Sequence, residues 1–198
     1  DKLSVNWQQM LARKEKVVDI SCKGLDYLMK KNKIDVYHGL AGFVDKNTIK
    51  ITDQKDQEQK ITSSKTIIAS GSKPISLPGL PIDKKKIISS TEALSLNEIP
   101  DKMIIVGGGV IGMEIGSIYS RLGTKITVLE FLDSIIPTMD RSLGKELRRL
   151  LKKLGFDIHT NHKVIKADVK SNIVTVTAEN KERKQLDFQA DYCLIVIG

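Results

Sequence analysis

Apolar and polar residues alternate along the chain in patterns that predict both helices and strands. From residue 4 to 31, apolar side chains recur with helical spacing and Lys and Glu fill the opposite face, which predicts a helix that Ser4 could cap. Further helices are predicted near 91–96, capped by Ser90 or Thr91, over 111–122, and from Asp140 or Ser142 to about 154. The last of these is expected to bury Leu143, Leu147, Leu150, Leu151 and Leu154.

Short apolar or alternating runs between these helices predict strands. They lie at 34–38, 41–44, 48–52, 60–62, 66–69, 87–88, 103–106, 126–129, 156–159, 163–169, 173–178, 184–188 and 192–197. Runs that are apolar throughout, such as Met103–Val106 and Tyr192–Ile197, indicate buried parallel strands, while 163–188 reads as an antiparallel meander. The pattern as a whole predicts an α/β fold.

Composition narrows the class of protein. With 40% hydrophobic and 28% charged residues, the 198-residue chain is typical of a globular protein with a real core. The net charge of +8 comes from dispersed lysines and arginines, and aromatic residues make up only 5%, so a stacking and phosphate-binding surface for nucleic acid is not indicated. No apolar run approaches the roughly 18 residues of a membrane span. Neither nucleic acid nor membrane is therefore expected as a partner.

The most informative stretch runs from Met103 to Glu130. A predicted strand is followed by G-x-G-x-x-G, formed by Gly107, Gly109 and Gly112, and then by a helix that Gly123 ends. In this motif the first glycine permits a tight turn, the second lets backbone approach a pyrophosphate, and the third allows close packing of helix and strand. The order strand, glycine turn, helix, strand and acidic residue predicts a dinucleotide-binding unit.

Glu130 follows the second strand, where a carboxylate can accept hydrogen bonds from both hydroxyls of an adenosine ribose. The same charge would repel a 2′-phosphate, so NAD is favoured over NADP. The helix start would supply free N–H groups and the positive end of its dipole to the phosphates. The alternative is a glycine turn in an ordinary α/β fold that binds no ligand.

A second stretch, Thr66–Pro74, runs from an apolar strand into small residues. It indicates either a ligand lying against backbone or a plain exit from a strand, and residues 74–100, which hold four of the five prolines, read as a crossover between domains. Cys22 and Cys193 form neither C-x-x-C nor a metal-ligand spacing and are both expected to be at least half-buried. The three histidines are expected to be structural or exposed, so no metal site is predicted.

The chain resembles the dihydrolipoamide dehydrogenases, flavoprotein disulfide reductases of the 2-oxo-acid dehydrogenase complexes. The resemblance runs from end to end, through KIISSTEALSLNEIP at 86–100, GGGVIGMEIGSIYSRLGTKITVLEFLDSIIPTMD at 107–140, NHKV at 161–164 and IVIG at 195–198. It implies FAD, NAD and a redox-active cysteine pair that oxidises dihydrolipoamide. It also implies a homodimer within such a complex, in a bacterial cytoplasm or the mitochondrial matrix.

The resemblance also implies site residues. The positions that match FAD contacts are Ala41 and the segment Ser70, Gly71 and Ser72, where Ser70 replaces the usual Thr. The positions that match NAD contacts are Gly107, Gly108, Gly109, Val110, Ile111, Gly112, Met113, Glu114, Glu130, Val164 and Gly198. Of these, Glu114 matches a glutamate near the flavin and nicotinamide, although a surface salt bridge would also explain it.

Three features of the resembled family are expected to lie outside these 198 residues: the FAD glycine motif, the redox cysteine pair, and the His–Glu acid–base pair. No catalytic residue is therefore assigned here, and FAD binding is expected to be incomplete. We expect a partial FAD-binding domain at 1–74, a crossover at 75–100, and a Rossmann-like NAD-binding domain of parallel sheet plus antiparallel meander at 101–198. The open alternatives are a stand-alone NAD-binding module without catalysis and a related flavin-dependent disulfide reductase.

Overall fold

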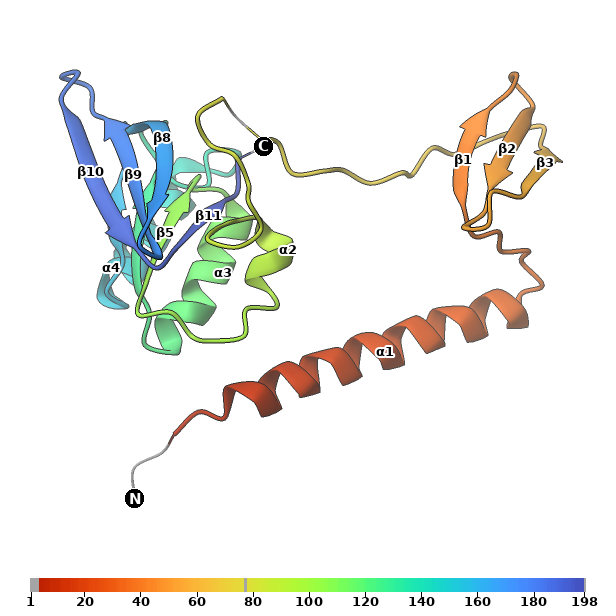
Figure 1. Cartoon of the computed structure of the whole chain (residues 1–198), viewed down its shortest axis with the longest axis horizontal. Coiled ribbons are helices and arrows are strands. Elements are labelled where there is room, and N and C mark those ends of the chain that lie inside the picture. The colour runs from red at the N-terminus through yellow and green to blue at the C-terminus, as the bar shows by residue number, and fades with distance from the viewer. Residues whose placement is uncertain (1–3, 77, 198) are drawn as a thin grey trace. The chain divides into compact units, whose positions relative to one another are not determined.

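The computed structural model describes residues 4–76 and 78–197, which form two compact units (Figure 1). One unit comprises residues 9–72. The other comprises residues 1–8 together with 73–198. Within the described residues, no helix has both the length and the apolar character needed to cross a membrane.

The 9–72 unit holds most of helix α1 (Trp7–Lys31) and a small antiparallel sheet. The sheet has the order β1-β2-β3, from β1 (Leu40–Phe43), β2 (Thr48–Thr52) and β3 (Glu58–Thr62). Each strand pairs only with its neighbour in sequence, as in a meander. No residue of α1 is buried, so the predicted amphipathic helix forms without a covered apolar face.

Two predicted strands do not form in this unit. Residues 34–38 and 66–69 lack strand structure, and the side chains of Ile67 and Ile68 are 92% and 74% exposed. A strand requires a partner for its backbone hydrogen bonds, and apolar side chains alone do not supply one. The prediction for these two runs was wrong because it rested on side-chain pattern only.

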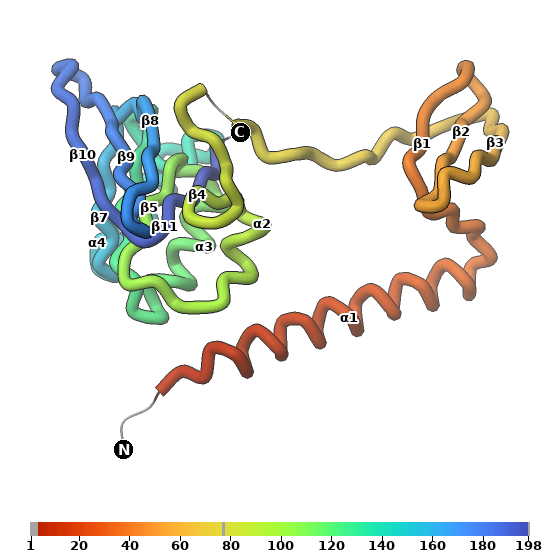
Figure 2. Tube along the Cα trace, in the orientation of Figure 1, coloured from red at the N-terminus to blue at the C-terminus, as the bar shows by residue number. Residues whose placement is uncertain are grey.

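The second unit is built on a five-stranded parallel sheet with the order β4-β11-β5-β6-β7. Its strands are β4 (Ile87–Ile88), β5 (Lys102–Val106), β6 (Lys125–Leu129), β7 (Asp157–His159) and β11 (Tyr192–Ile195). All four pairings are parallel. The predicted central position of the last strand is confirmed, since β11 lies between β4 and β5, and Figure 2 lets the chain be followed from β10 back to it.

Helices cover one face of this sheet and a second sheet covers the other (Figure 1). The helices are α2 (Ser90–Ala93), α3 (Val110–Arg121) and α4 (Arg141–Lys153). The antiparallel sheet has the order β10-β9-β8, from β8 (Lys163–Lys170), β9 (Ile173–Glu179) and β10 (Gln185–Ala190). On β5, Met103 and Ile105 pack on the helix side while Ile104 and Val106 pack on the antiparallel sheet. The fully apolar strand is thus buried on both faces.

Helix ends and helix faces differ in part from the expectation. Ser89, rather than Ser90 or Thr91, caps α2, and its capping box with Glu92 places the acidic residue in the first turn as predicted. Asp140 caps α4. Of the five leucines expected inside on α4 only Leu151 is buried, while Leu143, Leu150 and Leu154 are exposed. Gly144 is the other buried residue of α4, and a Cβ built on it would lie 2.9 Å from the carbonyl oxygen of Ile135.

Candidate functional site

One glycine in the turn between β5 and α3, and one in the first turn of α3, lie where a side chain would clash with backbone. Gly107 has φ +109°, and a Cβ there would lie 2.5 Å from the carbonyl oxygen of Val196. A Cβ at Gly112 would lie 2.7 Å from the carbonyl oxygen of Gly107. The first and third glycines of the motif therefore perform the steric roles predicted for them, a tight turn and a close approach of helix to strand.

Gly109 differs from these two because the space around it is open. It is the N-cap of α3, with extended backbone and no capping side chain, and a Cβ built on it would meet nothing within 4 Å. The first turn of a helix has N–H groups without intrahelical acceptors and carries the positive end of the dipole. An anion could approach the backbone here. Beyond the cap, Val110, Ile111 and Glu114 are exposed, whereas Gly112 and Met113 are buried.

Glu130 follows the end of β6 and is only 7% exposed. Its Oε2 accepts a hydrogen bond from the N–H of Gly108 at 2.5 Å, and its Oε1 accepts one from the N–H of Leu132 at 2.7 Å. A carboxylate offers about four lone-pair sites, so two remain for ligand hydroxyls. The acidic residue and the glycine turn, predicted from the sequence to act on one ligand, are in direct contact.

A cavity of about 450 Å³ opens beside Glu130. It lies at the carboxyl ends of the parallel strands, since Val106 ends β5, Leu129 ends β6 and Ile197 follows β11. Ligands bind at this edge in open α/β sheets. The lining is mostly apolar and includes Val164, which the family resemblance had indicated. Its other members are Ile75, Leu80, Gly107, Phe131, His162 and Lys163.

Several of these lining residues were missed in the sequence. His162, expected from the sequence to be structural or exposed, is half-buried and also lies in the cavity wall. Phe131 directly follows Glu130, and this position next to a predicted ligand residue could have indicated that it lines the site. Ile75 and Leu80 come from the proline-rich crossover, where no periodic pattern marked them.

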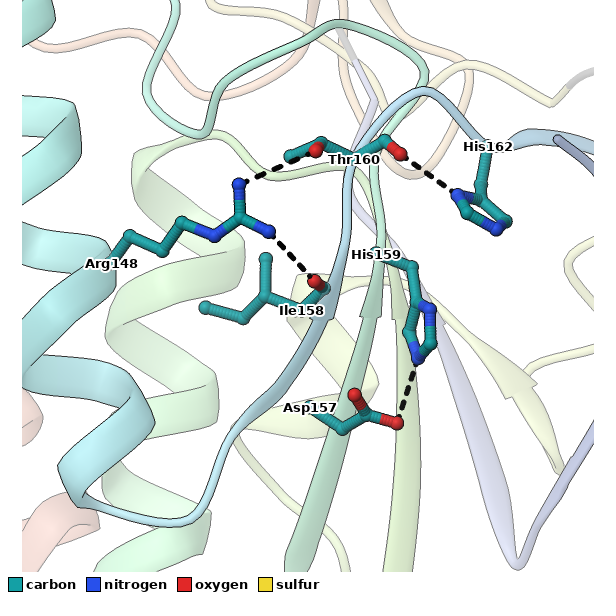
Figure 3. A network of polar contacts seen from close by, with 6 residues as sticks. All are labelled: Arg148, Asp157, Ile158, His159, Thr160 and His162. Atoms are coloured by element: carbon teal, nitrogen blue, oxygen red, sulfur yellow. Dashed lines mark hydrogen bonds and ion pairs between the residues drawn. The ribbon is translucent and has the colours of Figure 1, made fainter. Parts of the chain in front are cut away.

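Polar contacts hold β7 and the residues that follow it (Figure 3). Arg148 of α4 donates to the carbonyl of Ile158 at 3.1 Å and to Oγ1 of Thr160 at 3.4 Å. His159 lies 2.7 Å from Asp157, and Nδ1 of His162 lies 2.8 Å from the carbonyl of Thr160. Because a carbonyl only accepts, Nδ1 of His162 carries the proton. The network thus sets the position of His162 in the cavity wall.

The remaining site predictions lie elsewhere. Ala41 in β1 and the irregular segment Ser70, Gly71 and Ser72 are exposed, and they belong to the 9–72 unit. Gly198 lies outside the described residues. The structure therefore brings together the turn, Glu130 and Val164, and leaves the predicted FAD contacts in the other unit.

The two cysteines differ in environment. Cys22 is exposed on α1, so the expectation that it would be at least half-buried was wrong; no residue of this helix is buried. Cys193 is buried in β11, as expected, and burial, with a smaller effect of Asp83, raises the pKa of its thiol to about 12. Nowhere in the described part of the chain do three or more His, Cys, Asp or Glu side chains gather as a metal site would require.

Comparison with known proteins identifies the family to which the chain belongs. The model of the family described as pyridine nucleotide-disulphide oxidoreductase matches residues 3–198. Mitochondrial dihydrolipoyl dehydrogenase of Schizosaccharomyces pombe is 41% identical over 99% of this chain and 39% of its own length. Dihydrolipoyl dehydrogenase of Bacillus subtilis is 37% identical over 99% of this chain and 42% of its own length. The chain thus spans about two fifths of these relatives.

Among solved structures, the Cu(II) complex of the HOCl-induced flavoprotein disulfide reductase RclA from Escherichia coli superposes with a TM-score of 0.81. Its identity to this chain is 27%, over 96% of this chain and 42% of RclA. The resemblance inferred from the sequence motifs is confirmed. The chain belongs to the pyridine nucleotide-disulphide oxidoreductase family, an oxidoreductase family.

Proposed function

We propose that residues 101–198 bind NAD, with its adenosine ribose on Glu130 and its pyrophosphate at the start of α3. The observation that carries this proposal is the contact between the Glu130 carboxylate and the glycine turn, beside an open helix N-terminus and an apolar cavity. The donor set suits the ligand: free N–H groups for phosphates, a carboxylate for a diol, and apolar walls for a flat ring. The carboxylate also disfavours the 2′-phosphate of NADP.

The whole protein is proposed to be a dihydrolipoyl dehydrogenase that oxidises dihydrolipoamide and passes the electrons through FAD to NAD. The names of the two relatives above support this substrate. In this proposal residues 1–74 form part of an FAD-binding domain, in which Ala41 and Ser70–Ser72 contact the flavin nucleotide. Residues 75–100 form the crossover to the NAD-binding domain. The nicotinamide end is assigned to Glu114, and the remaining NAD contacts to Val164 and Gly198.

The chain alone is proposed to be inactive as a dehydrogenase. The reaction requires two thiols that exchange with a disulfide beside the flavin. Cys22 lies exposed on α1 and Cys193 is buried in β11, so neither has an exchange partner. We therefore expect little bound FAD and a colourless protein. A homodimer within a 2-oxo-acid dehydrogenase complex is proposed for the whole protein, in a bacterial cytoplasm or a mitochondrial matrix.

One alternative is favoured by a specific observation. The similarity to RclA, a flavoprotein disulfide reductase, supports a flavin-dependent reductase of another disulfide. A stand-alone NAD-binding module would share the same nucleotide site and differ only in lacking redox chemistry. The substrate therefore has to be decided by assay.

Calorimetric titration of the chain with NAD and NADP tests the binding site, and an absorbance scan followed by an assay with dihydrolipoamide tests activity. We expect NAD to bind more tightly than NADP, no flavin absorbance and no turnover. Tighter binding of NADP would overturn the cofactor assignment. A yellow protein that turns over dihydrolipoamide would overturn the assignment of the redox centre to residues outside this chain.

A further inference from the structure

Gly108, the middle residue of the glycine turn, is held by both of its backbone polar groups. Its N–H donates to Oε2 of Glu130, and its carbonyl accepts from the N–H of Ile136 at 2.7 Å. A Cβ at this position would come within 3.0 Å of Glu130 Oε2 and of a methyl group of Ile135. The turn is therefore fixed from two sides before any ligand is present.

Glu130 is itself rigidly placed. Its second carboxylate oxygen accepts from Leu132, its own N–H donates to the carbonyl of His159, and its carbonyl accepts from the N–H of His162, both at 2.9 Å. With a side chain that is nearly buried, the carboxylate has no freedom to follow a ligand. Through these hydrogen bonds, Glu130 connects the end of β6 to the glycine turn after β5.

We infer that Glu130 is a positioning residue for the phosphate-binding turn, in addition to the ribose contact expected of it. The inference rests on the proposed NAD site and adds a second role to one residue. By holding the N–H of Gly108 inward, Glu130 keeps the turn in the conformation that leaves Gly109 and the start of α3 open. Phosphate binding then depends on a carboxylate that does not touch the phosphate.

The sign of the electrostatic effect makes the two roles separable. A carboxylate close to a pyrophosphate repels it, so direct electrostatics predicts that neutralising Glu130 strengthens phosphate binding. A loss of affinity for a ligand that has phosphates but no ribose hydroxyls is therefore opposite in sign to the direct electrostatic effect, and supports an action through the turn. Glu130→Gln is the sharpest substitution because it keeps the shape, retains one acceptor oxygen, and places an amide donor against the other N–H.

The experiment is a titration of the full chain with ADP and with 2′,3′-dideoxy-ADP, which lacks both ribose hydroxyls. Wild type, Glu130→Gln and Asp133→Asn are compared. Asp133 is an exposed carboxylate in the same loop, paired with Arg141 at 3.4 Å, and controls for the loss of one negative charge. We expect Glu130→Gln to weaken both ligands, by about tenfold for the dideoxy compound, and Asp133→Asn to weaken neither.

A variant that loses affinity for ADP but binds the dideoxy compound as tightly as wild type would overturn the inference and leave the NAD site standing. A wild-type chain that binds neither ADP nor NAD would instead overturn the proposed function. Amide hydrogen exchange of the ligand-free protein gives a second readout. Faster exchange at Gly108 in Glu130→Ala, which leaves no side-chain acceptor for this N–H, supports the positioning role, and unchanged exchange at Gly108 in that variant overturns it.

Discussion

The α-carbon of Gly112 lies so close to the carbonyl oxygen of Gly107 that a Cβ built on it would be 2.7 Å from that oxygen. This oxygen belongs to the backbone of the glycine turn. The turn is fixed by the hydrogen bond from the Gly108 N–H to Glu130 and by the close contact of Gly107 with Val196. The first turn of α3 can therefore not move aside at low cost. Within one motif, Gly107 and Gly112 therefore allow close packing, whereas Gly109 leaves space for a ligand.

Gly112→Ala should lower the free energy of unfolding by about 2 kcal/mol, as overpacking of a tight interior does. Gly109→Ala is the matched control in the same turn, because φ there is −73° and no atom lies within 4 Å of the added methyl. Its effect should stay within about 0.5 kcal/mol. Urea unfolding of both variants measures the difference, and equal losses would contradict the packing seen at Gly112.

Gly109→Val should abolish NAD binding while the unfolding free energy stays near that of wild type. The open space at Gly109 is where the pyrophosphate is proposed to approach, and a branched side chain would occupy it. Calorimetric titration combined with thermal melting measures both properties on the same sample. Unchanged NAD affinity in a folded Gly109→Val variant would mean that the turn is only structural.

Glu130→Ala should weaken NAD binding by about 1–3 kcal/mol, because hydrogen bonds to the ribose are lost from a buried site. It should also narrow the preference for NAD over NADP, since the charge that repels a 2′-phosphate is removed. The ratio of the two dissociation constants is the quantity to compare with wild type. A ratio that does not move would place the ribose elsewhere.

The parts of the fold that were predictable are those specified by neighbours in sequence. Strand β5, the glycine turn, α3 and β6 follow one another within a short stretch, and Gly123 ends the helix with φ +104° as a C′ glycine does. The contact of Glu130 with Gly108 was not foreseen, because a motif specifies which residue types meet a ligand and not how they bond to one another.

Burial was the property that the sequence predicted least well. Cys22 and the outer leucines of α4 have the periodicity of buried residues and are exposed, since burial depends on which element packs against them. The run at 66–69 has the composition of a strand and lacks a partner. The cavity wall combines residues from the crossover, from the loop after β6 and from β8, which no local pattern joins.

Thiol reagents should therefore distinguish the two cysteines. Cys22 is exposed, whereas the Cys193 thiol is buried and has a pKa raised to about 12, so that it carries almost no thiolate at neutral pH. We expect one fast-reacting thiol in the native chain and two after denaturation. Cys22→Ala should remove the fast reaction, and Cys193→Ala should leave it intact. Two fast thiols in the native protein would contradict the burial of Cys193.

Alkaline pH should destabilise the unit that contains the parallel sheet. Burial raises the pKa of Cys193 from 9.0 to about 12, and burial, with a smaller effect of Tyr192, raises the pKa of Tyr119 from 10.0 to about 12. The unfolded chain loses the thiol proton above about pH 9 and the phenol proton above about pH 10, while the folded chain keeps both. The unfolded state then binds fewer protons, so the free energy of unfolding falls as pH rises.

The contribution of Cys193 to this fall in stability can be measured separately. A buried group that stays protonated only in the folded state contributes up to about 1.4 kcal/mol per pH unit above its unfolded pKa. Urea unfolding between about pH 9 and pH 11 should therefore show a shallower fall in Cys193→Ala than in wild type, despite the small cavity that the substitution leaves. Cys22→Ala, altered at an exposed position of α1, is the control and should keep the wild-type slope. Equal slopes in all three proteins would contradict this prediction. The Cys193 thiol, buried in β11, would then ionise as readily in the folded protein as in the unfolded chain.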